Sequence, residues 1–133
     1  MSIDSLIRFD SRGSVTLLVA NVEIGQGILT AVAQIAAEEL DINFDRIRIQ
    51  RADTGRTPTA SYTAGSNSIQ TVGSAFRQAA ADARHLLLQK AAVHLQTPAA
   101  TLHVVDGTIS ISTKNDSTGN NSADNYSADN YSA

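Results

Sequence analysis

The sequence contains no cysteine among its 133 residues. Disulfides, thiolate metal sites, iron–sulfur ligation and thiol nucleophiles are therefore excluded within this chain. Basic residues are also few: the 10 Lys and Arg are scattered, and the formal net charge is −3. Because no basic stripe could follow a phosphate backbone, we expect no nucleic acid partner.

Long apolar runs are missing as well. No stretch approaches the roughly 20 apolar residues that a membrane span needs, so we expect none. The first residues, Met1 to Ser5, lack the basic and apolar regions of an export signal. We therefore expect a cytoplasmic location, or a periplasmic one if an exported partner carries the chain.

The last part of the chain offers almost nothing to bury. After about Ser112 it consists of small and polar residues with tyrosine, and Ser-Ala-Asp-Asn-Tyr at 122–126 recurs at 127–131. Such a composition does not support a core. We predict one domain over residues 1–111 and a disordered tail over 112–133.

Hydrophobic periodicity predicts an α+β fold. The expected elements are a hairpin over 6–10 and 15–20, a helix over 28–40, a strand over 46–50, a helix over 69–95, and a hairpin over 102–105 and 108–111. The run from Val15 is the more uniformly apolar strand of its hairpin, which predicts a position inside the sheet. We expect a mixed β-sheet with two main helices packed on one face.

Two loops rich in small residues each precede a predicted helix: Gly25-Gln26-Gly27 and Thr-Ala-Gly-Ser-Asn-Ser at 63–68. Glycine lets a backbone approach a ligand closely, and the first N–H groups of a helix favour polar or anionic groups. If the two helix starts converge, they form a pocket suited to a phosphorylated or hydrogen-bonding cofactor. Taken alone, each loop is better explained as a glycine turn or as an ordinary helix cap by Ser66 or Ser68.

Other candidate residues carry less chemistry. Glu23 could act as a base, but it has no second acid beside it, which favours a structural carboxylate that holds the turn. His85 and His94 lie on nearly opposite faces of one helix and cannot share a metal, and His103 has no visible partner. The dinucleotide fingerprint is excluded because its third glycine is absent.

Several segments together resemble the molybdopterin-binding large subunit of the xanthine dehydrogenase and aldehyde oxidase family. The nearest type is the beta subunit of isoquinoline 1-oxidoreductase, and the likeness covers roughly residues 5–111. The segments follow the family's order and spacing: Val-Glu-Ile-Gly-Gln-Gly at 22–27, Gln-Ile-Ala-Ala-Glu-Glu-Leu at 34–40, Asp-Thr at 53–54, Thr-Pro at 57–58 and Thr-Ala-Gly-Ser-Asn-Ser-Ile at 63–69.

The resemblance implies an oxidoreductase that hydroxylates a small heteroaromatic or aldehyde substrate with oxygen from water. Its cofactor would be molybdopterin, the molybdenum cofactor, in a dinucleotide form, and a [2Fe-2S] small subunit would take the electrons. The residues implied to bind the cofactor are Gly25, Gln26, Gly27, Gly65, Ser66, Asn67 and Ser68. Family members vary at Asn67, so its contact would be made through the backbone.

The sequence also departs from the family's pattern. The family's large subunit is several times longer, and its catalytic glutamate lies in a Gly-x-Gly-Glu-type motif that has no match here. We therefore expect a fragment that holds half of a cofactor cradle, has no catalytic residue of its own and needs the remainder of the large subunit. Two alternatives stay open: a non-catalytic remnant or assembly module that docks through an open sheet edge, and a free-standing nucleotide-phosphate binder.

Overall fold

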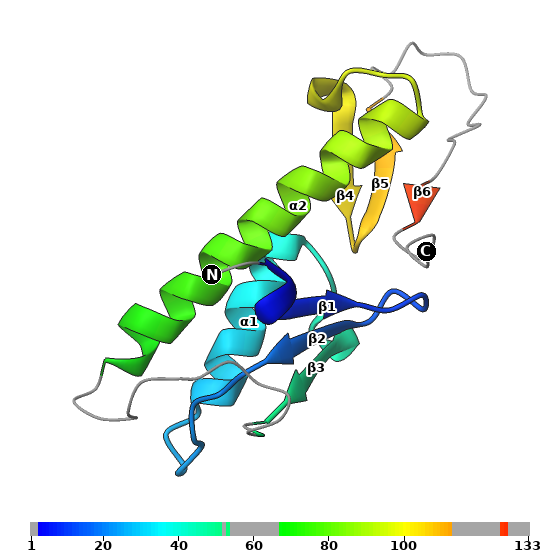
Figure 1. The fold of residues 1–133 in the computed structure, drawn as a ribbon. Helices are drawn as coiled ribbons and strands as arrows, with labels where there is room; N and C mark the ends of the chain where they lie inside the picture. Colours follow the sequence, from blue (N-terminus) through cyan, green and yellow to red (C-terminus); the bar gives the residue numbers. More distant parts are fainter. Residues whose placement is uncertain (1–2, 52, 54–66, 113–125, 128–133) are drawn as a thin grey trace.

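The computed structural model of the chain describes residues 3–51, 53, 67–112 and 126–127. The described helices and turns are η1 (Ile3–Ser5), α1 (Ile28–Leu40), η2 (Phe44–Arg46), η3 (Ile69–Gly73), α2 (Ser74–His94) and η4 (Ala99–Thr101). The described strands are β1 (Ile7–Phe9), β2 (Val15–Leu18), β3 (Ile47–Gln50), β4 (Leu102–Val105), β5 (Thr108–Ile111) and β6 (Tyr126–Ser127). This arrangement confirms the predicted α+β class (Figure 1).

The first sheet has the order β1-β2-β3, with β1 antiparallel and β3 parallel to β2. Its centre is β2, as the apolar composition of that strand predicted. The β1–β2 hairpin is closed by Asp10, whose Oδ1 accepts hydrogen bonds from the backbone N–H groups of Arg12 and Ser14, both at 2.8 Å. Such short polar side chains stabilise tight turns by bonding to their own backbone a few residues on.

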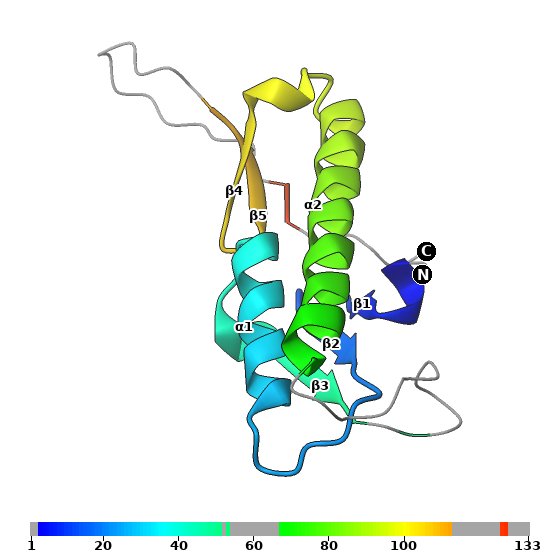
Figure 2. The same ribbon diagram turned by 90° about the vertical axis from the view of Figure 1, so that its left-hand side faces the viewer.

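Both long helices cover the same face of this mixed sheet (Figure 2). The register places Ile7 opposite Leu17, and Leu17 opposite Ile49, so three apolar side chains share one face. They pack against small and apolar side chains of α1 and α2, among them the fully buried Val32 and Phe76. The prediction of two main helices on one face is therefore confirmed.

The second half of α2 extends past α1 and carries a second sheet, of order β4-β5-β6 (Figures 1 and 2). Ala91 of α2 packs there against Val104 and Ile109. The predicted second hairpin is present, but it forms this separate sheet and does not extend the first one. Among the described helices, including the 21-residue α2, none combines the length and apolar character that crossing a membrane requires.

Two residues of the tail predicted to be disordered form β6. Ile109 pairs with Tyr126 and Thr108 with Ser127, in an antiparallel arrangement along the outer edge of β5. Residues 113–125 and 128–133 of that tail lie outside the described residues. The disorder of the tail over 112–133 stays a prediction.

The β4–β5 turn joins the two sheets, because its two residues bond to the segment that follows α1. Arg46 Nη1 donates to the carbonyl oxygen of Asp106 at 2.7 Å, and Asp106 Oδ1 accepts from the backbone N–H of Asn43 at 2.7 Å. The N–H of Gly107 donates to the carbonyl oxygen of Asp41, also at 2.7 Å. These contacts, which we call the hairpin latch, fix the second sheet against the first.

Candidate functional site

The loop between β2 and α1, which contains the glycines predicted to meet a ligand, has left-handed backbone at both of them. Gly25 has φ 95° and Gly27 has φ 76°, values that side chains with a Cβ rarely adopt. Among the described residues, a Cβ built on either glycine would meet no atom within 4 Å. Glycine is thus required by the backbone conformation, and the space beside both residues is open to another surface.

The carboxylate of Glu23 holds this loop together. Its Oε1 accepts from the backbone N–H groups of Gly25 and Gly27, each at 2.9 Å, and its Oε2 accepts from that of Leu29 at 3.2 Å. These bonds, that of Gly27 first and that of Leu29 second, hold the pKa of Glu23 below its ordinary value. The prediction of a structural carboxylate is therefore confirmed.

The amide of Gln26 closes the same loop from the other side. Its Oε1 accepts from the N–H of Ile24 at 2.7 Å, and its Nε2 donates to the carbonyl oxygen of Val22 at 2.9 Å. Gln26 is exposed, and a primary amide has a second N–H and a second lone pair beyond those two bonds. The side chain can therefore brace the loop and still bond outward.

These contacts correct one expectation about the start of α1. The first N–H groups of this helix were expected to await an anionic ligand, but Glu23 already supplies a negative charge there and binds the N–H of Leu29. A carboxylate is favoured at that end of a helix because the unpaired N–H groups carry partial positive charge. The loop is complete without a ligand.

Of the second predicted loop, Gly65 and Ser66 lie outside the described residues. Asn67 is exposed, and its carbonyl oxygen accepts from both the N–H and the hydroxyl of Thr71, each at 2.9 Å. Ser68 already has helical backbone, and its side chain makes no capping hydrogen bond. The prediction that Ser68 caps this helix is therefore wrong, because the helix has begun before it.

The two helix starts lie at the same end of the molecule. Figures 1 and 2 both show α1 and the η3–α2 segment rising from that end in the same general direction. They are in close contact, since a Cβ on Gly73 of η3 would lie 3.2 Å from Cδ1 of Ile35 in α1. The described part of the second loop, Asn67 and Ser68, thus begins at the end where the Gly25–Gly27 loop lies.

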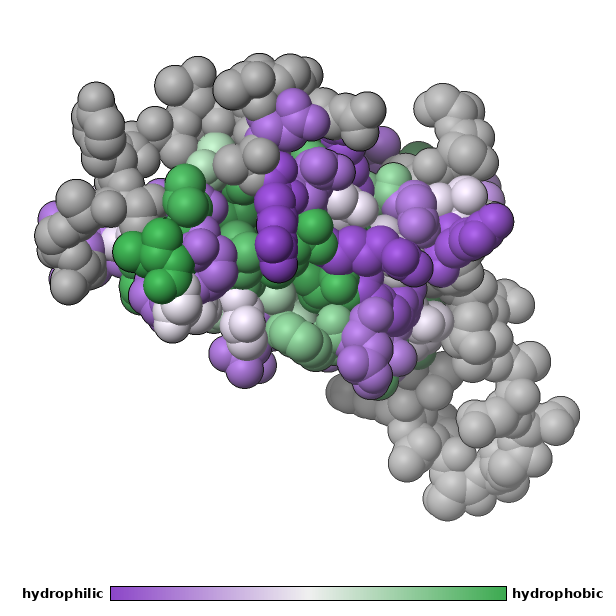
Figure 3. Space-filling model, turned by 90° about the horizontal axis from the view of Figure 1, so that it is seen from below, coloured by the Kyte–Doolittle hydropathy of each residue, from purple (hydrophilic) through white to green (hydrophobic). Residues whose placement is uncertain are grey.

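Exposed apolar side chains accompany this end. Val22 is 55% exposed, Ile24 75% and Ile69 48%, which is high for residues of this kind. The view from below shows apolar groups interrupted by polar ones (Figure 3). We call the Gly25–Gly27 loop with Val22, Ile24 and Ile69 the glycine-loop surface.

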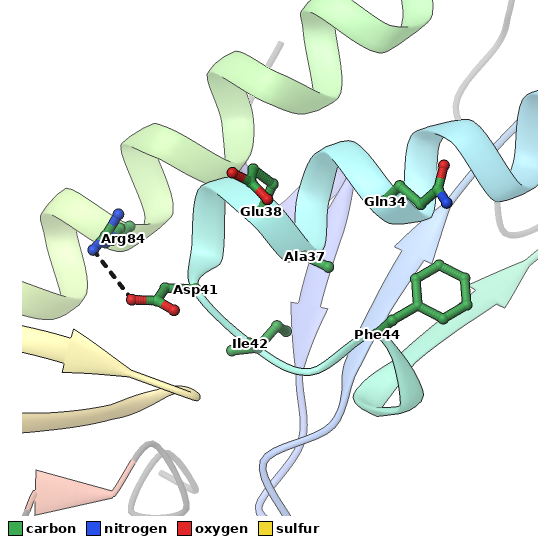
Figure 4. Close-up of a pocket in the computed structure, with 7 residues that line it drawn as sticks. All are labelled: Gln34, Ala37, Glu38, Asp41, Ile42, Phe44 and Arg84. Atoms are coloured by element: carbon green, nitrogen blue, oxygen red, sulfur yellow. Dashed lines mark ion pairs between the residues drawn. The ribbon is translucent and has the colours of Figure 1, made fainter.

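An open groove of about 740 Å³ lies at the other end of α1. It is lined by Gln34, Ala37, Glu38, Asp41, Ile42, Phe44 and Arg84 (Figure 4). Arg84 Nη2 lies 3.7 Å from Oδ2 of Asp41, so the two charged groups at its edge pair with each other. No sequence pattern indicated this groove, and none of the predicted cofactor residues lines it.

The histidines gain partners that the sequence analysis did not foresee. His103 was expected to have none, yet its Nε2 lies 3.0 Å from the hydroxyl oxygen of Ser110. The register shows the signal that was missed, because strands joined by the Asp106–Gly107 turn place residues 103 and 110 opposite each other. Within the described residues, no group of three or more His, Asp or Glu could hold a metal ion.

A comparison with protein families shows to which family the chain belongs. The family described as molybdopterin cofactor-binding domain matches residues 2–132. The chain belongs to this family. A nicotinate dehydrogenase subunit of Pseudomonas putida is 42% identical over 100 residues, which are 75% of this chain and 8% of that protein. The beta subunit of isoquinoline 1-oxidoreductase from Brevundimonas diminuta is 34% identical over 110 residues, which are 77% of this chain and 14% of that protein.

Parts of several solved structures have the same fold as this chain. CO dehydrogenase from Oligotropha carboxidovorans is similar with a TM-score of 0.71 and 32% identity, over 79% of this chain and 13% of the other. Quinoline 2-oxidoreductase from Pseudomonas putida 86 gives a TM-score of 0.69 and 27% identity over the same shares. The chain thus spans a small part of the length of the proteins it matches.

The described residues fit a molybdopterin in one specific respect. The open space beside Gly25 and Gly27 lets a cofactor approach the backbone without meeting a side chain. The exposed amide of Gln26 makes two hydrogen bonds within the loop, and it has a further N–H and a further lone pair that a cofactor could bind. Among the described residues the fit therefore depends on backbone shape and one neutral amide, since residues 22–27 include no Lys or Arg.

Proposed function

We propose that this molybdopterin cofactor-binding domain is part of the cofactor-binding subunit of a xanthine dehydrogenase or aldehyde oxidase-type oxidoreductase. The reaction would hydroxylate a heteroaromatic or aldehyde substrate with oxygen derived from water. One observation carries the proposal: the family match coincides with a preformed glycine loop that has open space beside it, at the end where both helices begin. Ligand sites are commonly built in this way, from largely preformed backbone with few polar groups.

In the proposed site, Gly25 and Gly27 let the cofactor lie close to the backbone, and the second N–H and second lone pair of the Gln26 amide form hydrogen bonds to it. Asn67 contributes through its backbone and Ser68 from the start of the second helix, with Gly65 and Ser66 assigned by their match to the family motif. A bound molybdopterin, proposed to be a dinucleotide form, would supply the redox chemistry. The role of the chain's own residues is to bind and orient it.

The proposal also requires partners. This sequence contains no cysteine, so its residues cannot ligate an iron–sulfur cluster, and the clusters are proposed to reside on a [2Fe-2S] small subunit. The chain spans 8% of the nicotinate dehydrogenase subunit and 14% of the isoquinoline 1-oxidoreductase subunit that it resembles. The catalytic glutamate, the rest of the cradle and the substrate pocket are proposed to lie in the remainder of the large subunit.

Metal analysis tests the proposal directly. The chain is co-expressed with molybdopterin biosynthesis, purified and assayed for molybdenum, and the expected result is stoichiometric metal without hydroxylase turnover on an artificial electron acceptor. Gly27→Asn is expected to lower the molybdenum content, because asparagine tolerates left-handed backbone but fills the open space. Gln96→Asn is the matched control, since Gln96 is exposed, has φ 51° and lies beyond the end of α2.

A second candidate is a non-catalytic assembly module that binds no cofactor. The observation that favours it is the exposure of Val22, Ile24 and Ile69, which is typical of a surface that another protein covers. In that case the purified chain contains no molybdenum, and Gly27→Asn and Gln96→Asn behave alike. Turnover by the chain alone would contradict both candidates.

A further inference from the structure

The start of α1 is already occupied by the chain's own anion. Both oxygens of the Glu23 carboxylate bond to backbone N–H groups, Oε1 to Gly25 and Gly27 at 2.9 Å and Oε2 to Leu29 at 3.2 Å. Those are the groups that a phosphate would use at a glycine loop followed by a helix. A second anion at this point would have to displace the carboxylate or lie against it.

The negative charge of Glu23 also disfavours a second anion at the start of α1. The interactions that most lower the pKa of Glu23 are hydrogen bonds from the N–H groups of Gly27 and Leu29. The side chain is therefore ionised at neutral pH, and its negative charge takes up the partial positive charge of the helix start. Two charges of like sign a few ångströms apart repel each other, and they do so more strongly near a protein surface than in bulk water.

The open space beside the loop nevertheless remains available to uncharged groups. Gly25 and Gly27 leave it free of atoms within 4 Å of a Cβ position, and Gln26 borders it with a neutral amide. The sequence pattern suggested both close approach of a ligand to the backbone and binding of an anion. In the structure the glycines leave room for close approach, whereas the anion that the loop binds is its own Glu23 carboxylate.

We propose that Glu23 is a positioning and specificity-determining residue, which fixes the shape of the Gly25–Gly27 loop and excludes phosphate from the start of α1. This rests on the proposed function, in which a phosphate-bearing cofactor docks at this end. The uncharged, hydrogen-bonding part of the cofactor then lies over the glycines, and its phosphates lie elsewhere. Glu23 acts through the backbone N–H groups that it holds.

Amide chemical shifts of the full-length chain measure the exclusion. Inorganic phosphate is titrated into isotope-labelled protein while the N–H signals of Gly25, Gly27 and Leu29 are followed. In the wild type we expect no saturable shift of these signals. In Glu23→Ala we expect a saturable response at least roughly tenfold tighter than any in the wild type, because the competing anion is gone.

Two further variants separate charge from loop shape. Glu23→Gln retains the side-chain length and one accepting oxygen, so we expect it to keep most of the loop's hydrogen bonds while it removes the charge. If Glu23→Ala loosens the loop, the phosphate titration of Glu23→Gln decides the test. Glu38→Ala makes the same charge change at an exposed position of α1 that is remote from the loop, and we expect it to behave as the wild type. Saturable phosphate shifts in the wild type, or none in either Glu23 variant, would overturn the assignment.

The molybdenum assay distinguishes this inference from the proposed function. If the wild type takes up no molybdenum while phosphate binds only to the Glu23 variants, the proposed function fails and the exclusion by Glu23 stands. If the wild type takes up molybdenum and phosphate also shifts its loop amides, the function stands and the exclusion fails. If both hold, Glu23→Gln is expected to take up less molybdenum than Glu38→Ala.

Discussion

Two glycine turns in this molecule are built from the same parts but serve opposite purposes. In the loop before α1, Glu23 accepts from the N–H groups of its own segment; in the hairpin latch, Asp106 accepts from the N–H of Asn43, 63 positions away in the sequence. A Cβ on Gly25 would meet nothing within 4 Å, whereas one on Gly107 would lie 2.9 Å from Cγ2 of Ile42. The first turn presents an open surface, and the second joins two sheets.

The comparison distinguishes a turn that is held by its own residues from a turn that connects distant parts of the fold. A loop that closes on itself with the five local hydrogen bonds of Glu23 and Gln26 is held by its own residues, so its outer side remains available to a ligand or partner. A turn that bonds to a distant segment joins parts of the fold, and the space beside its glycine is filled by side chains of that segment. Substitutions in the two turns should therefore have different consequences.

Gly107→Ala should have the largest effect on stability. The residue has φ 71°, and the added Cβ would also be 3.0 Å from Nη1 of Arg46. We expect backbone strain and crowding together to lower the free energy of unfolding by about 2–4 kcal/mol. Gly25→Ala is the control, because its Cβ would meet backbone strain but no crowding, and we expect it to lower the free energy of unfolding by about 1–2 kcal/mol. Urea unfolding measures both, and equal losses would remove the distinction between the turns.

Arg46→Ala should come next, because it removes one of the three hydrogen bonds of the latch and a bond to the β1–β2 turn. Arg46 bonds to the carbonyl oxygens of Gly13 at 2.8 Å and Asp106 at 2.7 Å. We expect a loss of about 2 kcal/mol, together with faster hydrogen exchange in β4 and β5 than in the first sheet. The comparison variant is Arg77→Ala, whose ion pair with Glu39 is at 2.6 Å but whose side chain is 73% exposed. Its loss should be under about 1 kcal/mol, and a larger one would contradict this ranking.

Sequence reasoning predicted the local turn well and the latch not at all. The bonds of Glu23 span at most six positions, so the spacing of one carboxylate and two glycines was enough to predict a held turn. The latch depends on where a hairpin near residue 106 comes to rest on residues 41–46, which no local pattern encodes. The order of helices and strands was predictable for the same reason, since periodicity is local. The separation into two sheets was not, because it depends on the long reach of α2.

The ligand capacity of the first loop shows the same limit. The glycine spacing predicted close approach of a backbone to a ligand, and the open space beside Gly25 and Gly27 agrees with it. The sequence favoured a carboxylate that holds the turn, but it did not show which N–H groups Glu23 would bind. The structure shows that they include the N–H of Leu29, at the start of α1, as well as those of the two glycines.

The acid dependence of stability should be smaller but distinctive. Backbone N–H groups, that of Gly27 first, lower the pKa of Glu23 below 4.5, and those of Ser14 and then Arg12 lower the pKa of Asp10 below 3.8. Each carboxylate therefore stabilises the fold above its unfolded pKa, and that contribution is lost as pH falls through its lower, folded pKa. The stability difference between the wild type and Glu23→Gln should shrink on acidification. A difference that stays constant from neutral to acid pH, in urea unfolding at each pH, would contradict the role of the charge.

Ile24→Ser should have the smallest effect on stability but should lower the amount of molybdenum that the protein retains. Ile24 is 75% exposed at the tip of the first loop, so we expect its replacement to change the free energy of unfolding by less than about 0.5 kcal/mol. Its apolar side chain instead contributes to the glycine-loop surface, and in the co-expression assay the molybdenum retained should fall. Ile28→Ser makes the same exchange four residues on, at a side chain only 2% exposed, and should destabilise the domain substantially. If Ile24→Ser destabilised the fold as Ile28→Ser does, the loop would belong to the core and the contrast with the latch would be lost.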